Sequence, residues 1–351
     1  MSMLAAASGR FVTGAPLLRA EHLRVEIPTR RGVLVALDDI SFTIAAGEIV
    51  GFVGESGAGK SLTGMAILGL LDPPGRVAAG EVWLGERRID SLSQREMRRV
   101  RGKEIGAVFQ DPLMSLNPLL QIGEQLVETI QTHLPVGRRE AIERALALMR
   151  AVGIPAAEAR FAAYPHQFSG GMRQRIVIAL ALCAEPRLIV ADEPTTALDV
   201  SIQAQVLQLL KDMCRERGTA MLLVTHDMGV IAETADRVCV MYAGRIVEVG
   251  AVEDVIRAPV HPYTRGLMAA IPTLAAPSGM LAQIDGAMPR LNARPSGCAF
   301  HPRCKDAVAR CREEAPPVES LGNRSVACWV AMQNGVAGGI RDIAVREGTT
   351  P

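Results

Sequence analysis

Aromatic residues are scarce in this sequence of 351 residues: seven Phe, three Tyr and two Trp make up 3% of the chain. Proteins that bind single-stranded nucleic acid stack its bases on aromatic side chains, so this scarcity argues against such a platform. An excess of charge is also missing, because 38 Lys and Arg against 37 Asp and Glu leave a net charge of +1. The chain therefore has no global field that attracts nucleic acid or an anionic membrane, and we expect no nucleic-acid partner.

A long hydrophobic run is absent as well. The densest one, residues 176–184, is far shorter than the roughly 20 apolar residues that span a bilayer. The first 16 residues lack a charged leader followed by an apolar core, so we expect no signal peptide. We therefore expect the chain to stay in the cytosol and to reach a membrane through a partner. A composition of 49% hydrophobic and 21% charged residues is that of a globular protein with a sizeable core.

A glycine-rich loop is the first motif that indicates a chemistry. It matches G-x-x-x-x-G-K-[ST] and lies between an expected buried strand at 48–53 and an expected helix at 61–71. Its glycines let backbone N–H groups converge on phosphate oxygens, and the helix adds its positive N-terminal end. In such a loop Lys60 reaches the β- and γ-phosphates and Ser61 coordinates Mg²⁺. The predicted ATP-binding residues are Gly54, Glu55, Ser56, Gly57, Ala58, Gly59, Lys60 and Ser61.

Two carboxylates follow an apolar run at 188–191, which has the pattern of a strand buried on both faces of a parallel sheet. Asp192, at the end of this strand, is placed to meet the Mg²⁺ shell. Glu193 is the candidate general base that polarises the attacking water. An Asp-Glu-Pro turn would be unremarkable by itself, but beside a phosphate loop it indicates nucleotide hydrolysis.

These motifs and their order resemble the ATP-binding subunits of ATP-binding-cassette (ABC) transporters, from about residue 17 to residue 250. The resemblance implies an α/β P-loop NTPase (RecA-like) core, with an antiparallel β subdomain and a helical subdomain. It also implies that Gln110 senses the γ-phosphate and Mg²⁺ and leads into the segment that touches the membrane subunit. By the same resemblance His226 contacts the γ-phosphate and Asp199 belongs to the loop that lines the dimer interface. The implied Mg²⁺ contacts are Ser61, Gln110 and Asp192.

A Ser-Gly-Gly element resembles the family signature, which binds the γ-phosphate held by the opposite subunit. Two subunits would then meet head to tail and close over two ATP molecules, each between one phosphate loop and the other signature. Hydrolysis would reopen this clamp. The implied signature residues are Ser169, Gly170, Gly171 and Met172.

One element departs from the family pattern. An aromatic residue ahead of the phosphate loop usually stacks on adenine, but no Phe, Tyr or Trp lies between Phe11 and Phe42. Ile27 or Val35 stands at this place, so we expect aliphatic packing of adenine and loose nucleotide selectivity.

Three further segments resemble the oligopeptide and dipeptide importer branch, in its D-type subunit: residues 109–118, 164–168 and 261–264. The resemblance implies a heterodimer with a second, F-type ATPase subunit, two integral membrane permease subunits and an extracytoplasmic solute-binding protein. It places the chain peripherally at the cytoplasmic face of the inner membrane. Related importers carry nickel or other small solutes, which stays an alternative. A second alternative is a soluble ABC ATPase that takes no part in transport, although the chain has neither a coiled-coil insertion nor a second cassette.

Four of the seven cysteines gather near the C-terminus, at Cys298, Cys304, Cys311 and Cys328. Their gaps of 5, 6 and 16 residues differ from the paired C-x₂-C spacing of common zinc sites. Four thiolates are the ligand set of a [4Fe–4S] cluster, which the resemblance implies here. Zinc and free thiols stay alternatives. The other cysteines, Cys183, Cys214 and Cys239, are expected in the core.

The expected domain organisation has three parts. Residues 1–16 form an N-terminal tail, and 17–270 form the nucleotide-binding domain, with its helical subdomain at about 111–184. Residues 271–351 form the small C-terminal region with the four cysteines. Because prolines multiply after residue 250, we expect this region to be a looser appendage.

Overall fold

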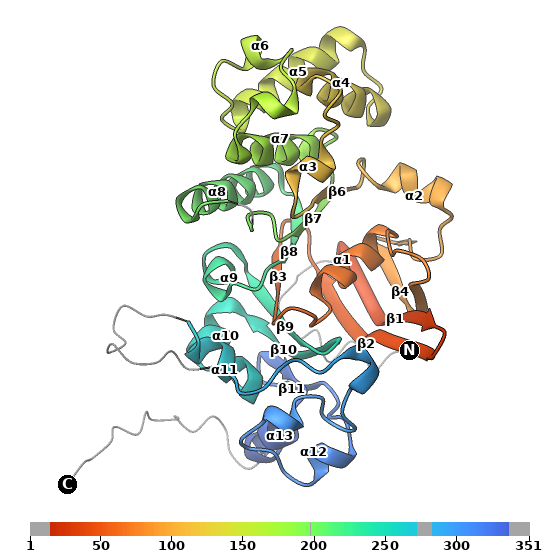
Figure 1. Cartoon of the computed structure of the whole chain (residues 1–351), viewed down its shortest axis with the longest axis vertical. Helices are drawn as coiled ribbons and strands as arrows, with labels where there is room; N and C mark the ends of the chain where they lie inside the picture. The colour runs from red at the N-terminus through yellow and green to blue at the C-terminus, as the bar shows by residue number, and fades with distance from the viewer. Residues whose placement is uncertain (1–14, 197, 272–282, 337–351) are drawn as a thin grey trace, which may run out of the picture.

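The computed structural model describes residues 15–196, 198–271 and 283–336. An eight-stranded sheet runs through the molecule, with helices on both faces and a second, antiparallel sheet beside it (Figure 1). In sheet order its strands are β11 (Glu319–Leu321), β12 (Arg324–Val326), β10 (Arg245–Ala251), β9 (Arg237–Tyr242), β3 (Ile49–Val53), β8 (Ala220–Val224), β7 (Leu188–Asp192) and β6 (Ile105–Val108).

The centre of this sheet is parallel. β3 pairs with β8 and β9, and β7 pairs with β6 and β8, so all five strands run in the same direction. Their apolar side chains are buried on both faces, as continuous apolar strands require. The strands predicted at 48–53 and 188–191 are confirmed to within a residue. Helix α1 (Lys60–Leu68) follows β3 through the glycine-rich loop, and helix α8 (Val200–Arg217) connects β7 to β8.

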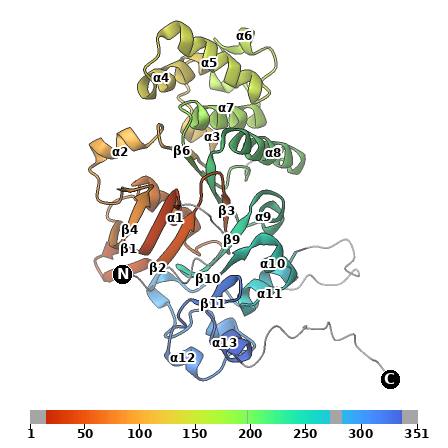
Figure 2. The same cartoon turned by 180° about the vertical axis from the view of Figure 1, so that it is seen from behind.

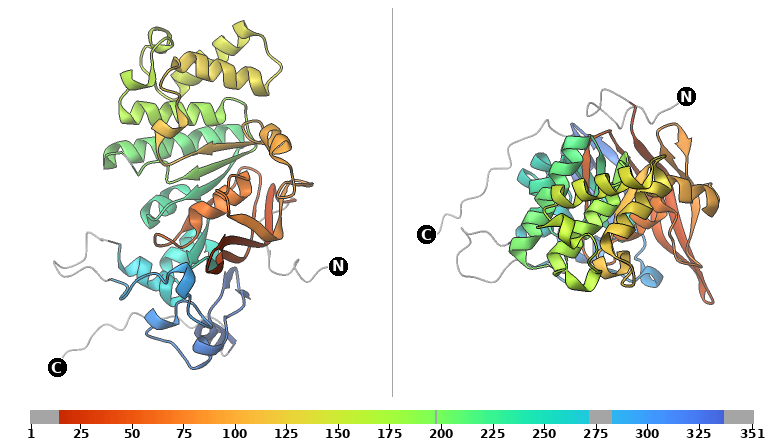
Figure 3. Two further views of the ribbon diagram at one scale, coloured as in Figure 1. Left: turned by 45° about the vertical axis from the view of Figure 1, so that its right-hand side comes forward. Right: turned by 90° about the horizontal axis from the view of Figure 1, so that it is seen from above.

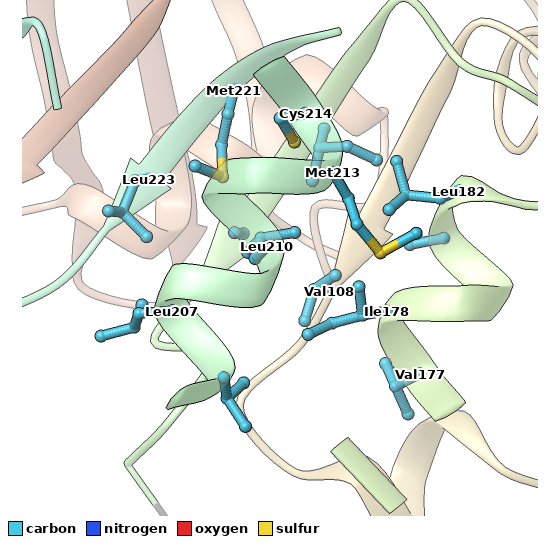
Figure 4. Close-up of a cluster of buried hydrophobic side chains, with 14 of the residues drawn as sticks. Val108, Val177, Ile178, Leu182, Leu207, Leu210, Met213, Cys214, Met221 and Leu223 are labelled. Carbon is cyan, nitrogen blue, oxygen red and sulfur yellow. The ribbon is translucent and has the colours of Figure 1, made fainter. Parts of the chain in front are cut away.

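Helices α7 (Gly170–Leu182) and α8 cover one face of the sheet. Figure 4 shows their side chains meeting over β6 and β8. Gly106 in β6 allows this approach, because a Cβ there would lie 2.3 Å from the carbonyl oxygen of Ala181. The labelled contacts come from Val177, Ile178 and Leu182 of α7, Leu207, Leu210, Met213 and Cys214 of α8, and Val108, Met221 and Leu223 of the sheet.

The antiparallel sheet has the order β2-β1-β4-β5. β1 (Leu18–Thr29) and β2 (Gly32–Ile44) form an antiparallel hairpin in this sheet. β4 (Arg76–Leu84) and β5 (Arg87–Arg88) complete the sheet, and helix α2 (Gln94–Val100) leads from it to β6. The sequence pattern alone predicted neither β4 nor α2.

A group of helices forms one end of the molecule, opposite the C-terminal elements (Figures 1 and 2). Two of these helices, over 122–133 and 138–151, are separated by residues 134–137. Pro135 lacks the N–H that an α-helix needs, and Gly137 caps the second helix. The elements here are α3 (Pro112–Ser115), α4 (Ile122–His133), α5 (Arg138–Ala151), α6 (Ala157–Arg160) and the 3₁₀ turn η2 (Pro165–Gln167), followed by α7.

The C-terminal elements lie at the other end, below the sheet in Figure 3. The expectation of a loose appendage is wrong in one respect: β12 pairs with β10, through Glu248 and Val326, and extends the central sheet. No helix of the described part is long and apolar enough to cross a membrane. The elements at this end are α10 (Val252–Arg257), α11 (Pro262–Ala269), the 3₁₀ turns η3 (Leu291–Ala293) and η4 (His301–Arg303), α12 (Arg310–Glu313) and α13 (Trp329–Val336). Helix α9 (Met228–Thr234) lies beside β3 and α8 instead (Figure 1).

Candidate functional site

The glycine-rich loop of residues 54–61 joins β3 to α1 with a geometry that excludes side chains at two positions. Gly59 has φ +106°, and a Cβ there would lie 2.7 Å from Leu37. A Cβ at Gly54 would lie 2.3 Å from the carbonyl oxygen of Met241. The loop therefore packs its backbone tightly over the ends of the strands, as a phosphate cradle requires.

Lys60 is buried inside this loop. Its ammonium donates to the carbonyl oxygens of Gly54 (2.7 Å) and Glu55 (3.2 Å). Burial lowers the pKa of Lys60, and the charges of Glu193 and Asp192 oppose this shift. A partly desolvated cation beside converging N–H groups favours an anionic ligand.

Ser61 and Asp192 meet at the carboxyl edge of the sheet. The Ser61 hydroxyl donates to Oδ1 of Asp192 at 2.8 Å. Burial raises the pKa of Asp192, although the Ser61 hydrogen bond opposes it, so a nearby cation would stabilise the ionised carboxylate. A hydroxyl and a carboxylate are oxygen ligands that suit Mg²⁺.

Glu193 and His226 form a second pair at the same edge. Nδ1 of His226 lies 3.1 Å from Oε1 of Glu193, and the Thr196 hydroxyl donates to Oε2 at 2.8 Å. Burial raises the pKa of Glu193, but the hydrogen bonds from His226 and Thr196 outweigh it and hold the pKa below its ordinary value. Glu193 also has φ +45°, a backbone strain that is typical of functional positions.

Gln110 lies at the same edge, two residues beyond the end of β6, and is exposed. Because β6 pairs in parallel with β7, the segment after β6 leaves the sheet beside Asp192. Within the described residues no hydrogen bond joins Gln110 to Ser61 or Asp192. The structure thus brings Gln110 to the correct edge of the sheet but not into contact with the other predicted Mg²⁺ ligands.

The predicted signature begins α7. Ser169 caps this helix, because its hydroxyl accepts from the Met172 N–H at 3.4 Å, and both Ser169 and Gly170 are exposed. A Cβ at Gly171 would lie 2.8 Å from Ile202 of α8, so the signature packs closely against that helix. Asp199 is the N-cap of α8, while Ala197 lies outside the described residues. The signature therefore faces outward rather than toward its own loop within the described residues.

Comparison with known proteins decides the family. Residues 37–196 match the family model described as ABC transporter, and residues 247–311 match the model of the oligopeptide/dipeptide transporter C-terminal region. The oligopeptide transport ATP-binding protein OppD of Salmonella typhimurium is 46% identical over 314 residues, which cover 89% of this chain and 93% of that protein.

The chain belongs to the ATP-binding proteins of the oligopeptide/dipeptide ABC transporter family. The dipeptide transport ATP-binding protein DppD of Haemophilus influenzae is 42% identical, over 89% of this chain and 94% of its own length. AppD of Bacillus subtilis, an oligopeptide transport ATP-binding protein, is 42% identical over 91% of this chain and 98% of its own length.

Solved structures agree with this family. The dimeric ATP-binding cassette MJ0796, bound to ADP and Pi, is 29% identical and superposes with a TM-score of 0.60 over 67% of this chain and 98% of that one. CbiO1 of Clostridium perfringens, part of an ABC transporter complex, is 27% identical. It superposes with a TM-score of 0.60 over 70% of this chain and 92% of that one. The predicted α/β P-loop NTPase fold is confirmed, and the protein is an ATPase.

Two aliphatic residues, Ile27 and Val35, occupy the positions at which adenine packing was predicted. Ile27 pairs with Leu34 and Val35 pairs with Glu26 across the β1–β2 hairpin. Sequence analysis missed Arg294, whose guanidinium donates to the Val35 carbonyl oxygen at 3.2 Å. No local signal marks this residue, because it lies 259 residues along the chain from its partner.

The four C-terminal cysteines of this ABC ATPase lie near one another. Burial raises the pKa of Cys298 to about 11, and the nearby Cys311, Cys328 and Cys304 contribute smaller parts of this shift. The backbone N–H of Cys298 donates to the carbonyl oxygen of Cys311 at 2.8 Å. However, no group of three or more His, Cys, Asp or Glu residues in the described part is arranged to hold a metal ion, so the predicted metal site is not confirmed. The three other cysteines are buried, as predicted.

Proposed function

We propose that this ABC ATPase drives the import of dipeptides and oligopeptides by hydrolysing ATP at the loop of residues 54–61. The observation that carries the peptide assignment is the match of residues 247–311 to the C-terminal region of oligopeptide/dipeptide transporters. The names of the relatives OppD and DppD point to the same solutes.

The geometry of the site supports the following division of labour. The loop and Lys60 hold the phosphates of ATP, and Ser61, Asp192 and Gln110 would hold Mg²⁺. When bound, Mg²⁺ neutralises charge that develops on the phosphate oxygens. Glu193, whose pKa lies below its ordinary value, is ionised at neutral pH and is free to accept hydrogen bonding from the attacking water.

His226 completes the site in this proposal. Its ring holds Glu193 through Nδ1, so its other nitrogen is left to reach the γ-phosphate of bound ATP. The hydrogen bond thereby couples the presence of the γ-phosphate to the orientation of the base.

The second half of each ATP site comes from another subunit. Ser169, Gly170, Gly171 and Met172 are proposed to bind the γ-phosphate held by the partner, and Asp199 to line the interface between the two. The exposure of Ser169 and Gly170 at the N-terminal end of α7 supports this role. The partner is proposed to be a related F-type ATPase subunit, which makes the clamp a heterodimer.

An apolar surface directly after Gln110 supports docking to permeases. Leu113 and Leu120 are exposed there, and Met114 and Leu119 are 84% and 82% exposed. A group of exposed apolar side chains that lie together commonly marks a surface that binds another protein. We propose that two integral membrane permease subunits cover them and that a solute-binding protein delivers the peptide. The chain would then act at the cytoplasmic face of the inner membrane.

The four C-terminal cysteines are proposed to ligate a [4Fe–4S] cluster. In such a cluster each thiolate binds a different iron, so the four sulfurs need to surround a volume rather than converge on one ion. The mutual charge effects of Cys298, Cys304, Cys311 and Cys328 support this donor set. We also propose residues 17–270 as the nucleotide-binding domain, with the helical subdomain at about 111–184, and 271–351 as the C-terminal region.

Uptake measurements test the proposed function. In a strain that lacks the gene, the wild-type gene should restore uptake of labelled dipeptides or oligopeptides, and Lys60→Ala should not. Lys211→Ala, a lysine on α8 away from the site, is the control and should restore uptake fully. Restored uptake of labelled nickel without peptide uptake would replace the peptide assignment by the metal one.

Metal analysis tests the cluster. Protein purified without oxygen should contain about four iron atoms per chain and absorb light at roughly 400 nm, as thiolate-bound clusters do. Cys304→Ser should lower both signals, whereas Cys214→Ser, at a buried cysteine of α8, should change neither. Stoichiometric zinc, or no metal at all, would refute the cluster.

A further inference from the structure

Glu55, the second residue of the phosphate loop, is held at three points. Its N–H donates to the Tyr263 hydroxyl at 2.8 Å, and its carbonyl oxygen accepts from Lys60. Its carboxylate accepts two hydrogen bonds from the Arg303 guanidinium, at 2.8 and 3.0 Å. Two of these three contacts come from residues beyond 250, outside the segment that forms the rest of the loop.

The Arg303 side chain is almost fully buried, with 7% of its surface exposed. Burial lowers the pKa of Arg303, but the hydrogen bonds with Glu55 and Tyr242 outweigh this and raise the pKa above its ordinary value. Backbone carbonyl oxygens of Ile284 and Asp285 accept its remaining N–H groups. The guanidinium is therefore charged and fixed in place, and it makes a bidentate interaction with the Glu55 carboxylate of the loop.

Tyr263 is equally fixed. Its ring is fully buried and packs edge-on against Tyr242, with 4.7 Å between ring centroids, and against Phe300 at 5.4 Å. His261 caps the helix that carries Tyr263, because its Nδ1 accepts from the Tyr263 N–H. The segment at 261–264, which resembles the importer branch, thereby acquires a physical role at the ATP site.

We infer that Arg303 and Tyr263 are positioning residues that hold the phosphate loop through Glu55 in the shape that binds ATP. They make the C-terminal region a working part of the nucleotide site rather than an independent appendage. The carbonyl oxygen of Glu55 is one of the two that hold Lys60, so displacement of Glu55 also displaces the ammonium that must meet the phosphates. This inference rests on the proposed role of residues 54–61.

The Arg303–Glu55 pair is not required to attach the C-terminal region. β12 joins the central sheet, Arg265 pairs with Asp306 at 2.6 Å, and Arg294 pairs with Asp38 at 3.2 Å. These contacts hold the region to other parts of the protein without touching the phosphate loop. The pair at Glu55 is therefore the contact whose loss should affect nucleotide binding most selectively.

Nucleotide binding tests the inference in the full chain, assembled with its partner subunits. Glu55→Gln and Arg303→Met should each weaken binding of a fluorescent ATP analogue about tenfold, the loss expected for one charge-assisted contact. The double variant should bind no worse than either single variant, because both remove the same interaction. Arg303→Lys should restore part of the affinity, since an ammonium keeps the charge but not the fork. The KM for ATP should rise while kcat stays near the wild-type value.

Two controls decide what a loss means. Arg265→Lys weakens a contact between α11 and the C-terminal region away from the loop, and it should leave ATP binding unchanged. The inference would be overturned if Arg265→Lys and Arg303→Met lost ATP affinity equally. It would also be overturned if Arg303→Met and Glu55→Gln both bound ATP with wild-type affinity. Lys60→Ala must abolish binding; if it does not, the proposed role of the loop itself fails. An unchanged thermal midpoint in Glu55→Gln, which alters a single atom, excludes misfolding as the cause.

Discussion

Two adjacent carboxylates at the end of β7 differ in protonation tendency because their surroundings differ. Burial raises the pKa of Asp192, whereas the hydrogen bonds of Glu193 lower its pKa despite burial. The first carboxylate is stabilised in its charged form when a cation arrives, and the second is charged already. Neighbouring groups with pKa values shifted in opposite directions mark a division of roles at a catalytic site.

The pH dependence of stability depends in part on His261. Burial lowers the pKa of this residue to about 3, from an ordinary value of 6.5. Between these values the unfolded chain binds a proton that the folded chain does not, so stability is full above pH 6.5 and decreases as the pH falls. Lowering the pH from 6.5 to 5 should cost the wild type about 2 kcal/mol through this residue.

Urea unfolding of wild type and His261→Asn measures this contribution. Asn keeps an oxygen that can cap the helix at Tyr263 but does not titrate. The difference in free energy of unfolding between the two proteins should therefore shrink or reverse as the pH falls. A difference that is the same at pH 7 and pH 5 would show that His261 is not buried in its neutral form.

At the scale of elements, the contact between β6 and α7 places the signature. Gly106→Ser should lower the free energy of unfolding by about 1–3 kcal/mol, because its Cβ would overlap the backbone of α7. Gly137→Ser is the matched control: nothing lies within 4 Å of its Cβ position, and Ser is a favoured N-cap for α5. Unfolding by urea should show a loss for the first variant only. Equal stability of both would mean that α7 does not pack against Gly106.

Local patterns explain which elements the sequence predicts. The strands beside the predicted phosphate loop are continuous apolar runs, and the candidate site residues follow them at fixed positions, so Lys60, Asp192 and Glu193 were predicted from spacing. The break between α4 and α5 was not predicted, although it has a local cause, because Pro135 cannot continue a helix. β4 was not predicted. Several of its residues are exposed, and its partner strand β1 lies far from it in the sequence.

Contacts between distant segments were not predictable. Arg303 lies 248 residues from Glu55, and no periodicity or motif relates one to the other. The pairing of β12 with β10 was missed for the same reason, since β12 has only 3 residues and lies far along the chain from β10. The four C-terminal cysteines were singled out by residue type alone, but their arrangement in space depends on backbone geometry that the spacing does not determine.

At the scale of the whole molecule, the exposed apolar surface after Gln110 lies near the helical end, far from the C-terminal elements in Figure 1. Met114→Glu and Leu119→Glu should reduce recovery of permease subunits with the purified chain about tenfold, because each places a charge in an apolar contact. Binding of ATP should be unaffected. Val318→Glu, at an exposed apolar residue of the C-terminal region, is the control. Full recovery of permeases with the first two variants would place their docking surface elsewhere.

The most direct test of the account is ATP hydrolysis by the assembled transporter that carries Glu193→Gln. The variant should bind ATP within about twofold of the wild type and release phosphate at least about 100-fold more slowly, because the site has lost its base. Glu216→Gln, at an exposed position of α8, should hydrolyse ATP at the wild-type rate. Undiminished phosphate release by Glu193→Gln would contradict the assignment of the catalytic base and with it the mechanism proposed for this site.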